Sequence, residues 1–183
     1  GGGGAILASQ QDSSIKAVVA LAAWLDNPSI TLDNNTATLF ISGEFDNIAP
    51  NNIHTDVFYN NTSEDIDKLL YEISGGFHNT VTSPYNDEEM GLKTLFWIQK
   101  YILNDFSNCD SLITEPPTAS TFLTNLDCSA DIIGDITQDG ITNVLDLVLL
   151  ISWIVNGITP SGQEMVFANI VQDNTLDIFD IIM

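Results

Sequence analysis

The fold is decided by Ala37-Thr38-Leu39-Phe40-Ile41-Ser42-Gly43-Glu44-Phe45-Asp46, a short apolar run that ends in a polar loop. Runs of this kind are typical of strands that are buried on both faces of a parallel sheet. Similar runs occur at residues 16–22 and 68–73, and helical patterns cover about residues 4–11, 51–59 and 87–103. Strands that alternate with helices predict an α/β fold with a largely parallel sheet.

The long helical pattern at 87–103 has an apolar stripe, which we expect to face the sheet. The stripe consists of Leu92, Leu95, Phe96, Ile102 and Leu103. Residues 107–130 contain Pro116-Pro117 and read as a linker-like tail. Residues 131–183 differ again, with two acidic loops and an apolar helix at 147–156. We therefore expect part of an α/β domain over 1–128 and a small all-α module over 131–183.

The charge balance excludes several classes of partner. The chain has 25 acidic residues, four lysines and no arginine, which gives a net charge of −21. Such a chain repels phosphate backbones and anionic membrane surfaces, so it predicts neither nucleic-acid nor membrane binding. No apolar run is long enough for a transmembrane helix. The carboxylates serve solubility or the ligation of cations.

Two cysteines, Cys109 and Cys128, lie in the Thr/Pro/Ser-rich tail without a CxxC motif or a histidine cluster. This pattern does not indicate zinc. A disulfide between them would contribute about 3 kcal/mol and would indicate an oxidising compartment. Two unrelated buried thiols are the alternative.

The chain opens on Gly1-Gly2-Gly3-Gly4, directly followed by the apolar residues Ala5-Ile6-Leu7-Ala8. Glycines before a helix suit a tight strand-to-helix turn in which backbone packs on backbone. In hydrolases with a Gly-x-Ser-x-Gly elbow, glycine follows the reactive serine. On that interpretation the chain begins one or two residues after its nucleophile, and no such motif occurs within it. A flexible glycine linker is the alternative.

Asp46 and His78 each follow a predicted strand by a few residues, in loops that contain glycine. Catalytic groups of parallel α/β sheets lie at these strand ends. The order of glycine turn, Asp and His is that of the α/β-hydrolase triad, in which His is the general base and Asp orients it. A loop-capping Asp and a surface His are the alternative. Because the other histidine, His54, falls in a polar helical pattern, His78 is the candidate base.

In their order and spacing these motifs resemble bacterial cutinases and polyester (PET) hydrolases. The resemblance rests on residues 1–4, 22–24, 45–50 and 75–78, with a last helix similar to 97–105, and it covers about residues 1–128. It implies a secreted bacterial serine esterase that acts on an ester substrate. It further implies that Asp46 and His78 belong to the triad, that Trp24 lines the substrate cleft and that Cys109 pairs with Cys128. The nucleophile and an oxyanion donor would lie upstream.

Residues 135–146 fit a twelve-residue calcium loop. Such a loop places oxygen ligands at fixed positions and needs a sharp turn at position 6, here Gly140. The expected Ca²⁺ ligands are Asp135, Thr137, Asp139, Asn143, Asp146 and the backbone carbonyl of Ile141. An Asp-rich surface turn is the alternative.

A second loop follows at 169–180, with expected ligands Asn169, Asp173, Thr175, Asp177 and Asp180. Val171 cannot ligate through its side chain, so this loop should bind calcium more weakly or only imitate the first in shape. Two such repeats without an entering helix resemble a dockerin, whose second helix has barely begun at Met183. The resemblance implies a cohesin-like protein partner.

In dockerins, positions 10 and 11 of each repeat usually contact cohesin, and here they hold Val144-Leu145 and Ile178-Phe179. Packing within the module is the alternative role of these pairs. We therefore expect an esterase fragment with a calcium-dependent docking module. A non-catalytic docking protein with a degenerate hydrolase-like half is the alternative.

Overall fold

The computed structural model describes residues 1–83, 85–103, 105–128, 133–137, 141–160, 163–171, 173 and 175–182. The chain divides into two compact units, Gly1–Leu126 and Asp127–Met183. The first unit is a mixed α/β structure, whereas the elements described in the second are helices.

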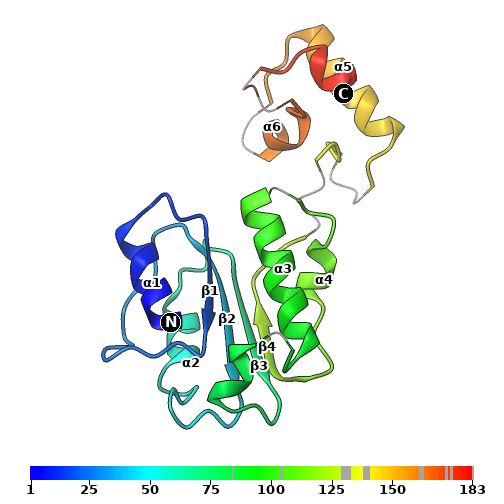
Figure 1. Cartoon of the computed structure of the whole chain (residues 1–183). Coiled ribbons are helices and arrows are strands. Elements are labelled where there is room, and N and C mark those ends of the chain that lie inside the picture. Colours follow the sequence, from blue (N-terminus) through cyan, green and yellow to red (C-terminus); the bar gives the residue numbers. More distant parts are fainter. Residues whose placement is uncertain are drawn as a thin grey trace. The chain divides into compact units, whose positions relative to one another are not determined.

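A four-stranded sheet forms the centre of the first unit (Figure 1). Its strands follow the order β1 (Ala17–Leu21), β2 (Ala37–Gly43), β3 (Lys68–Ile73) and β4 (Ala119–Thr124). The pairs β1–β2 and β2–β3 are parallel, and β4 is antiparallel to β3. The mixed α/β fold and its mostly parallel sheet are thus confirmed.

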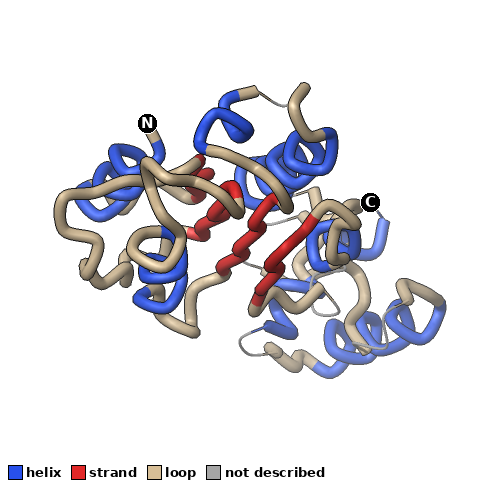
Figure 2. The backbone as a smooth tube through the Cα atoms, turned by 90° about the horizontal axis from the view of Figure 1, so that it is seen from below, coloured by secondary structure: helices blue, strands red, loops and turns tan. Residues whose placement is uncertain are grey.

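Helices cover both faces of this sheet (Figure 2). Alternate residues of β2 divide between the two layers, because side chains along a strand point to opposite faces. Phe40 packs in the layer of α1 (Gly2–Gln11) and α2 (Thr55–Asn61). Leu39 and Ile41 pack in the opposite layer, with α3 (Glu88–Leu103), α4 (Cys109–Ile113) and the short helix η1 (His78–Thr82).

The tail at 107–130 is not the linker that its composition suggested. It contains α4 and then β4, which extends the sheet beside β3. Because β4 is rich in Ser and Thr and only partly buried, it lacks the apolar run by which the other strands are predicted. Pairing with β3, a contact distant in sequence, makes it a strand.

The predicted apolar stripe of α3 is confirmed only at Phe96, which is partly buried against the core. Leu95, Ile102 and Leu103 are exposed, and the buried face consists of Met90, Lys93, Trp97 and Lys100. Lysine has a long apolar stem and can be buried where its ammonium group finds oxygen atoms or aromatic rings. The rule that charged residues lie on the solvent-exposed face of a helix therefore does not hold for α3.

The second unit contains α5 (Val144–Asn156), α6 (Gln163–Ala168) and α7 (Phe179–Ile182). Its core is formed by Ile136, Leu150 and Ala168. Helix α5 begins three residues earlier than expected, because Asn143 and Asp146 form a capping box at its first turn. It ends at Gly157, whose φ of 61° is the left-handed conformation that glycine adopts easily.

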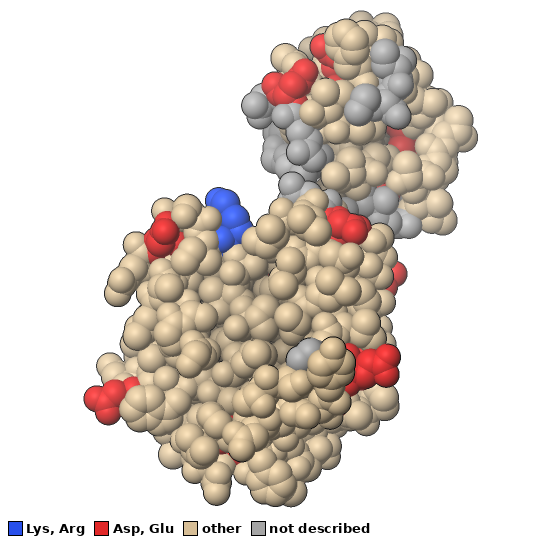
Figure 3. All heavy atoms as spheres, viewed as in Figure 1, with Lys and Arg blue, Asp and Glu red and all other residues tan. Residues whose placement is uncertain are grey.

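Positive charge is almost absent from the surface. Of the four lysines, Lys68, Lys93 and Lys100 are buried, and Lys16 is exposed. On the face drawn in Figure 3, acidic side chains are scattered over the surface and basic ones occupy one small spot. No helix in the described part of the chain is long and apolar enough to cross a membrane.

Candidate functional site

The loops that follow β2 and β3 touch along their backbones. The Phe45 N–H donates to the Gly76 carbonyl at 2.7 Å, and the Glu44 N–H donates to the Ile73 carbonyl at 3.0 Å. A Cβ atom on Gly43 would lie 2.5 Å from the Gly76 carbonyl oxygen, so this approach requires glycine. The two loops therefore bring residues 46 and 78 to the same edge of the sheet.

Asp46 and His78 form a hydrogen bond at this edge. Asp46 Oδ2 lies 2.8 Å from His78 Nδ1, and Asp46 Oδ1 accepts the backbone N–H groups of Ile48 at 2.9 Å and Ala49 at 2.8 Å. The Asp46 side chain is fully buried, whereas that of His78 is 27% exposed. An ionised carboxylate only accepts hydrogen bonds, so His78 carries its proton on Nδ1. Nε2 is then left as the basic nitrogen.

The glycines at the start of the chain pack against the loop that follows β1. Gly2 and Gly3 are buried in the first turn of α1. Added Cβ atoms would lie 2.4 Å from the Leu21 carbonyl oxygen and 2.1 Å from that of Trp24, respectively. The flexible-linker interpretation is therefore wrong for these two residues, which belong to a close-packed helix start.

A pocket of about 330 Å³ lies beside His78. Gly1 and Gly2 line it together with His78 and with Leu21 and Ala22 at the end of β1. The first residues of α1 and the candidate base His78 thus share one cavity.

Trp24 follows β1 and is 51% exposed. It does not line the pocket beside His78, and its ring centroid lies 5.9 Å from that of His54. The role of Trp24 in a substrate cleft stays a prediction.

His54 lies close to the site, although its helical pattern suggested otherwise. It directly precedes α2, is 5% exposed and packs against Trp24 and Phe58. Burial lowers the pKa of His54, and the charge of Asp46 opposes this effect only in part. The sequence did contain a signal for this closeness, because Asp46 and His54 lie on either side of Pro50 in the segment that follows a predicted strand.

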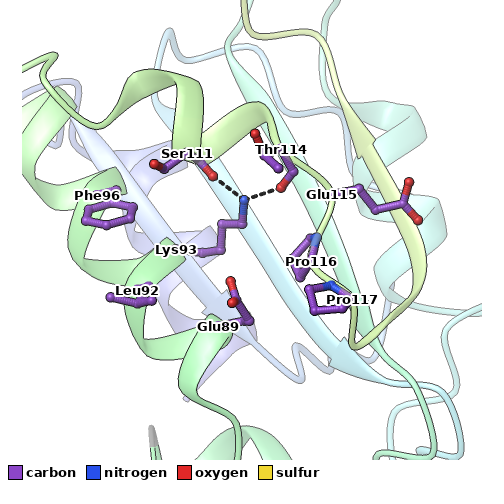
Figure 4. A pocket seen from close by; sticks show the side chains of 9 residues that line it. All are labelled: Glu89, Leu92, Lys93, Phe96, Ser111, Thr114, Glu115, Pro116 and Pro117. Carbon is purple, nitrogen blue, oxygen red and sulfur yellow. Dashed lines mark hydrogen bonds between the residues drawn. The ribbon is translucent and has the colours of Figure 1, made fainter.

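A second hollow, of about 320 Å³, lies between α3 and the segment after α4 (Figure 4). The Lys93 ammonium group donates hydrogen bonds to the carbonyls of Ser111, Leu112 and Thr114. Burial lowers the pKa of Lys93 to about 8. Because these contacts use all three N–H donors of the ammonium group, we assign Lys93 to holding the end of α4 rather than to binding a ligand.

Two backbone-to-carboxylate hydrogen bonds recur in the two predicted calcium loops. Asp146 accepts the N–H groups of Thr137 at 2.9 Å and Asn143 at 2.7 Å. Asp180, at the same position of the second loop, accepts those of Val171 at 3.0 Å and Asp177 at 3.0 Å. The carboxylate at position 12 of each loop thus accepts hydrogen bonds from the backbone N–H groups of positions 3 and 9.

The ligand sets can be placed only in part. Asp139 and Gly140 of the first loop lie outside the described residues. Within the described ranges, no group of three or more acidic, histidine or cysteine residues is arranged to hold a metal. Asp135, Asp146 and Asp180 are each 2% exposed, and carboxylate oxygens are the donors that calcium prefers.

Other expected ligands make local hydrogen bonds. Asn143 Oδ1 accepts the Leu145 N–H at 2.8 Å, and the Ile141 carbonyl accepts from Asn143 Nδ2 at 3.0 Å. In the second loop, Asn169 Oδ1 accepts the Asp173 N–H at 3.3 Å, and Asp173 Oδ1 accepts the Thr175 N–H at 2.9 Å. Calcium binding stays a prediction for both loops.

Both cysteines, Cys109 and Cys128, are disulfide-bonded. The predicted disulfide is therefore confirmed, and the alternative of two unrelated thiols is excluded.

Comparison with known proteins identifies a family. A model of the PET hydrolase-like family matches residues 1–129. Cutinase est2 of Thermobifida alba is 29% identical over 118 residues, which are 64% of this chain and 38% of the relative. A cutinase of Thermobifida fusca (strain YX) is 31% identical over 108 residues, 57% of this chain and 34% of the relative. Lipase 1 of Moraxella sp. (strain TA144) is 30% identical over 105 residues, 57% of this chain and 32% of the relative.

The matches span less than two-fifths of the length of these relatives. The family model covers the part of the chain that carries the sheet, the Asp46–His78 pair and the N-terminal glycines. By the match over residues 1–129, the chain belongs to the PET hydrolase-like family.

Proposed function

We propose that this chain is the C-terminal part of a secreted bacterial serine esterase of the cutinase and polyester-hydrolase type. The observation that carries the proposal is the 2.8 Å hydrogen bond between Asp46 Oδ2 and His78 Nδ1 at the ends of two parallel strands. The disulfide of Cys109 and Cys128 supports an oxidising, extracellular location.

In this proposal a segment that precedes Gly1 carries the nucleophilic serine. Gly1 and Gly2 line the same pocket as His78, so a serine just before them lies within reach of His78 Nε2. Nε2 takes the serine proton as the hydroxyl oxygen attacks the ester carbonyl. The buried Asp46 carboxylate holds the ring and stabilises the imidazolium that forms.

The later steps use the same two residues. The imidazolium of His78 returns its proton to the leaving alcohol, and His78 then takes a proton from the water that hydrolyses the acyl-enzyme. Trp24 and Ile48 are exposed at the same edge of the sheet and supply apolar surface for the substrate. The oxyanion donor belongs to the upstream segment.

The test compares the chain alone with the chain joined to the polypeptide encoded upstream of Gly1. The chain alone should not turn over p-nitrophenyl butyrate, because it lacks a nucleophile. The joined protein should hydrolyse it, and His78→Ala should abolish turnover. His54→Phe, which replaces the other histidine but keeps a ring against Trp24 and Phe58, should retain activity. Undiminished turnover by His78→Ala, or an upstream sequence without a Gly-x-Ser elbow, would contradict the proposal.

The second proposal is that residues 131–183 form a calcium-dependent docking module of the dockerin type. Two observations support it: the shared bracing by Asp146 and Asp180, and the burial of these carboxylates. In the first loop Asp135 and Asp146 are both buried, and a calcium ion bound within that loop offsets the repulsion between them. Because Thr137 is a neutral ligand and Val171 is none, the first loop binds calcium more tightly than the second.

The surface for a cohesin-like partner is formed by the pairs Val144-Leu145 and Ile178-Phe179. Each of these four residues is more than half exposed. If the hydrolase-like unit proves inactive even with its upstream segment, docking alone becomes the function of the chain.

Calorimetric titration of the whole chain with calcium chloride tests this second proposal. Asp139→Ala should remove most of the binding heat, and Asp173→Ala should remove less. Absence of calcium binding by the unaltered chain would exclude a calcium module. The reverse order of the two variants would mean that the second loop is the stronger site.

A further inference from the structure

A cavity of about 400 Å³ lies at the edge of the sheet where its three parallel strands begin. Its polar walls are Lys16 before β1, Asn35 before β2, Asp65 and Asp67 before β3, and Tyr101 of α3. Asp46 and His78 follow the opposite ends of β2 and β3. Because β2 spans seven residues, the cavity is about 20 Å from that pair. It is therefore distinct from the candidate active site.

The walls of this cavity are held by the fold. The Lys16 carbonyl accepts the Ala37 N–H at 3.1 Å, which fixes the backbone of Lys16 against β2. The Tyr101 hydroxyl donates to Asp67 Oδ2 at 2.6 Å, and the Tyr101 ring centroid lies 4.6 Å from that of the buried Trp97. Groups that are positioned before a ligand arrives lose less conformational entropy when it binds.

Several polar groups around the cavity have no partner in the described part of the chain. The Lys16 ammonium group forms no hydrogen bond or ion pair there, and neither does the Asp65 carboxylate. The side-chain amide of Asn35 is likewise unpaired within that part. Asp67 Oδ1 accepts no hydrogen bond from a described residue, since Tyr101 donates to Oδ2. Donors and acceptors thus surround one space without saturating each other.

The mixture of charges defines the chemistry of the ligand. A cation would be repelled by Lys16, and an anion would be repelled by Asp65 and Asp67 in a chain whose net charge is −21. A hydroxyl group both donates and accepts, so neighbouring hydroxyls can bond to a carboxylate and to an ammonium group at the same time. Small-molecule sites commonly have volumes of about 300–1,000 Å³, a range that includes this cavity. An uncharged molecule with several hydroxyl groups therefore matches all of the polar walls.

We infer that this cavity binds a sugar through its hydroxyl groups. Lys16 and the Asn35 amide donate to hydroxyl oxygens, and the carboxylates of Asp65 and Asp67 accept hydroxyl protons. Tyr101 keeps Asp67 in position for this contact. The site holds a sugar at one edge of the sheet and leaves the opposite edge free. It does not depend on the proposed esterase function.

Ligand-observed NMR titrations of the whole 183-residue chain test this inference. The probes are the methyl pyranosides of glucose, galactose and mannose, which differ in the orientation of single hydroxyl groups. At least one should bind, and its fully O-methylated derivative, which has no hydroxyl donor, should bind about tenfold more weakly or not at all. Lys16→Met keeps the aliphatic stem but removes the ammonium group, and Asp65→Ala removes a carboxylate. Each should weaken binding of that sugar about tenfold, through the loss of hydrogen bonds to a charged group.

Asp33→Ala is the matched control, because Asp33 is exposed like Asp65 but does not line the cavity. It should bind the sugar as the unaltered chain does. Backbone amide resonances at the starts of β1, β2 and β3 should shift on addition of the sugar, whereas those of Asp46 and His78 should not.

Absence of binding by all three glycosides would overturn the inference, as would equal affinities in the three variants. Tighter binding of the zwitterion L-serine than of any glycoside would also overturn it, because charges rather than hydroxyl groups would then be recognised. The hydrolysis experiment uses the opposite edge of the sheet, so its failure would leave these binding results unaffected.

Discussion

At the scale of single residues, the site depends on Gly43. A Cβ atom there would meet the Gly76 carbonyl oxygen at 2.5 Å, and both partners are backbone in loops that are tied together. We expect Gly43→Ala to lower the free energy of unfolding by about 1–3 kcal/mol, because the loops must move apart.

The control for this prediction is Gly4→Ala, also a glycine change but inside α1, where an added Cβ has no neighbour within 4 Å. Alanine should stabilise that helix by about 0.5–1 kcal/mol. Chemical denaturation of both variants is the measurement. Equal stabilities for the two variants would contradict the role assigned to Gly43.

His54 gives the second prediction at this scale. Its pKa is lowered from 6.5 by burial, so the folded protein binds the proton less readily than the unfolded chain. Stability is therefore unaffected above the unfolded pKa and falls as the pH drops below 6.5. His54→Phe keeps a ring against Trp24 and Phe58 but cannot titrate. Denaturation should show that the free energy of unfolding falls less between pH 7.5 and pH 5 in this variant than in the unaltered chain. Equal decreases in the two proteins would refute the assignment.

The sequence could place Asp46 and His78 because each follows a recognisable strand. Their hydrogen bond also depends on a backbone approach between two loops, which no local pattern encodes. His54 was misread for a related reason. The helical pattern predicted its element but not the packing of α2 on the sheet, which buries this side chain.

At the scale of elements, Lys93 links α3 to α4. Its ammonium group donates to carbonyls of Ser111, Leu112 and Thr114, where α4 ends. Lys93→Met should destabilise the protein by about 1–3 kcal/mol at pH 7, because buried carbonyls lose their donor. Lys16→Met, at an exposed lysine, should change stability by less than about 0.5 kcal/mol.

The same residue predicts a pH dependence. Burial lowers the pKa of Lys93 from 10.5 to about 8, so between these values the unfolded chain holds more protons than the folded one. Stability from this group therefore rises with pH across that window. The difference in free energy of unfolding between the unaltered chain and Lys93→Met should grow from pH 8 to pH 10. A constant difference would show that Lys93 titrates normally.

The buried lysines show that the sequence predicts a helix more readily than it predicts which face of the helix is buried. The helix at 87–103 was found from its length and period, but its buried face was assigned by hydropathy alone. Lys93 and Lys100 lie on that face because α4 and neighbouring rings supply partners for their ammonium groups. The sequence does not predict strand β4, because its pairing with β3, rather than its own composition, makes it a strand.

At the scale of the whole molecule, the disulfide of Cys109 and Cys128 constrains the segment that carries β4. Reduction of this disulfide should lower the free energy of unfolding by about 3 kcal/mol, because the unfolded chain gains conformational entropy. Denaturation of the chain with and without reductant measures this cost. Cys109→Ser/Cys128→Ser should behave as the reduced chain does and should not respond to reductant. Equal stability in all four measurements would show that the bond is dispensable.

The central claim is that Asp46 and His78 are two members of a catalytic triad whose serine precedes Gly1. The most direct measurement is kcat for p-nitrophenyl butyrate in the protein joined to its upstream segment, with Asp46→Asn as the test and Asp33→Asn as the control. Asp46→Asn should keep the fold but favour the wrong tautomer of His78, and kcat should fall by about 10⁴-fold. Asp33→Asn should leave kcat unchanged. A decrease of less than about tenfold in Asp46→Asn would contradict the account, because the 2.8 Å contact would then have no catalytic role.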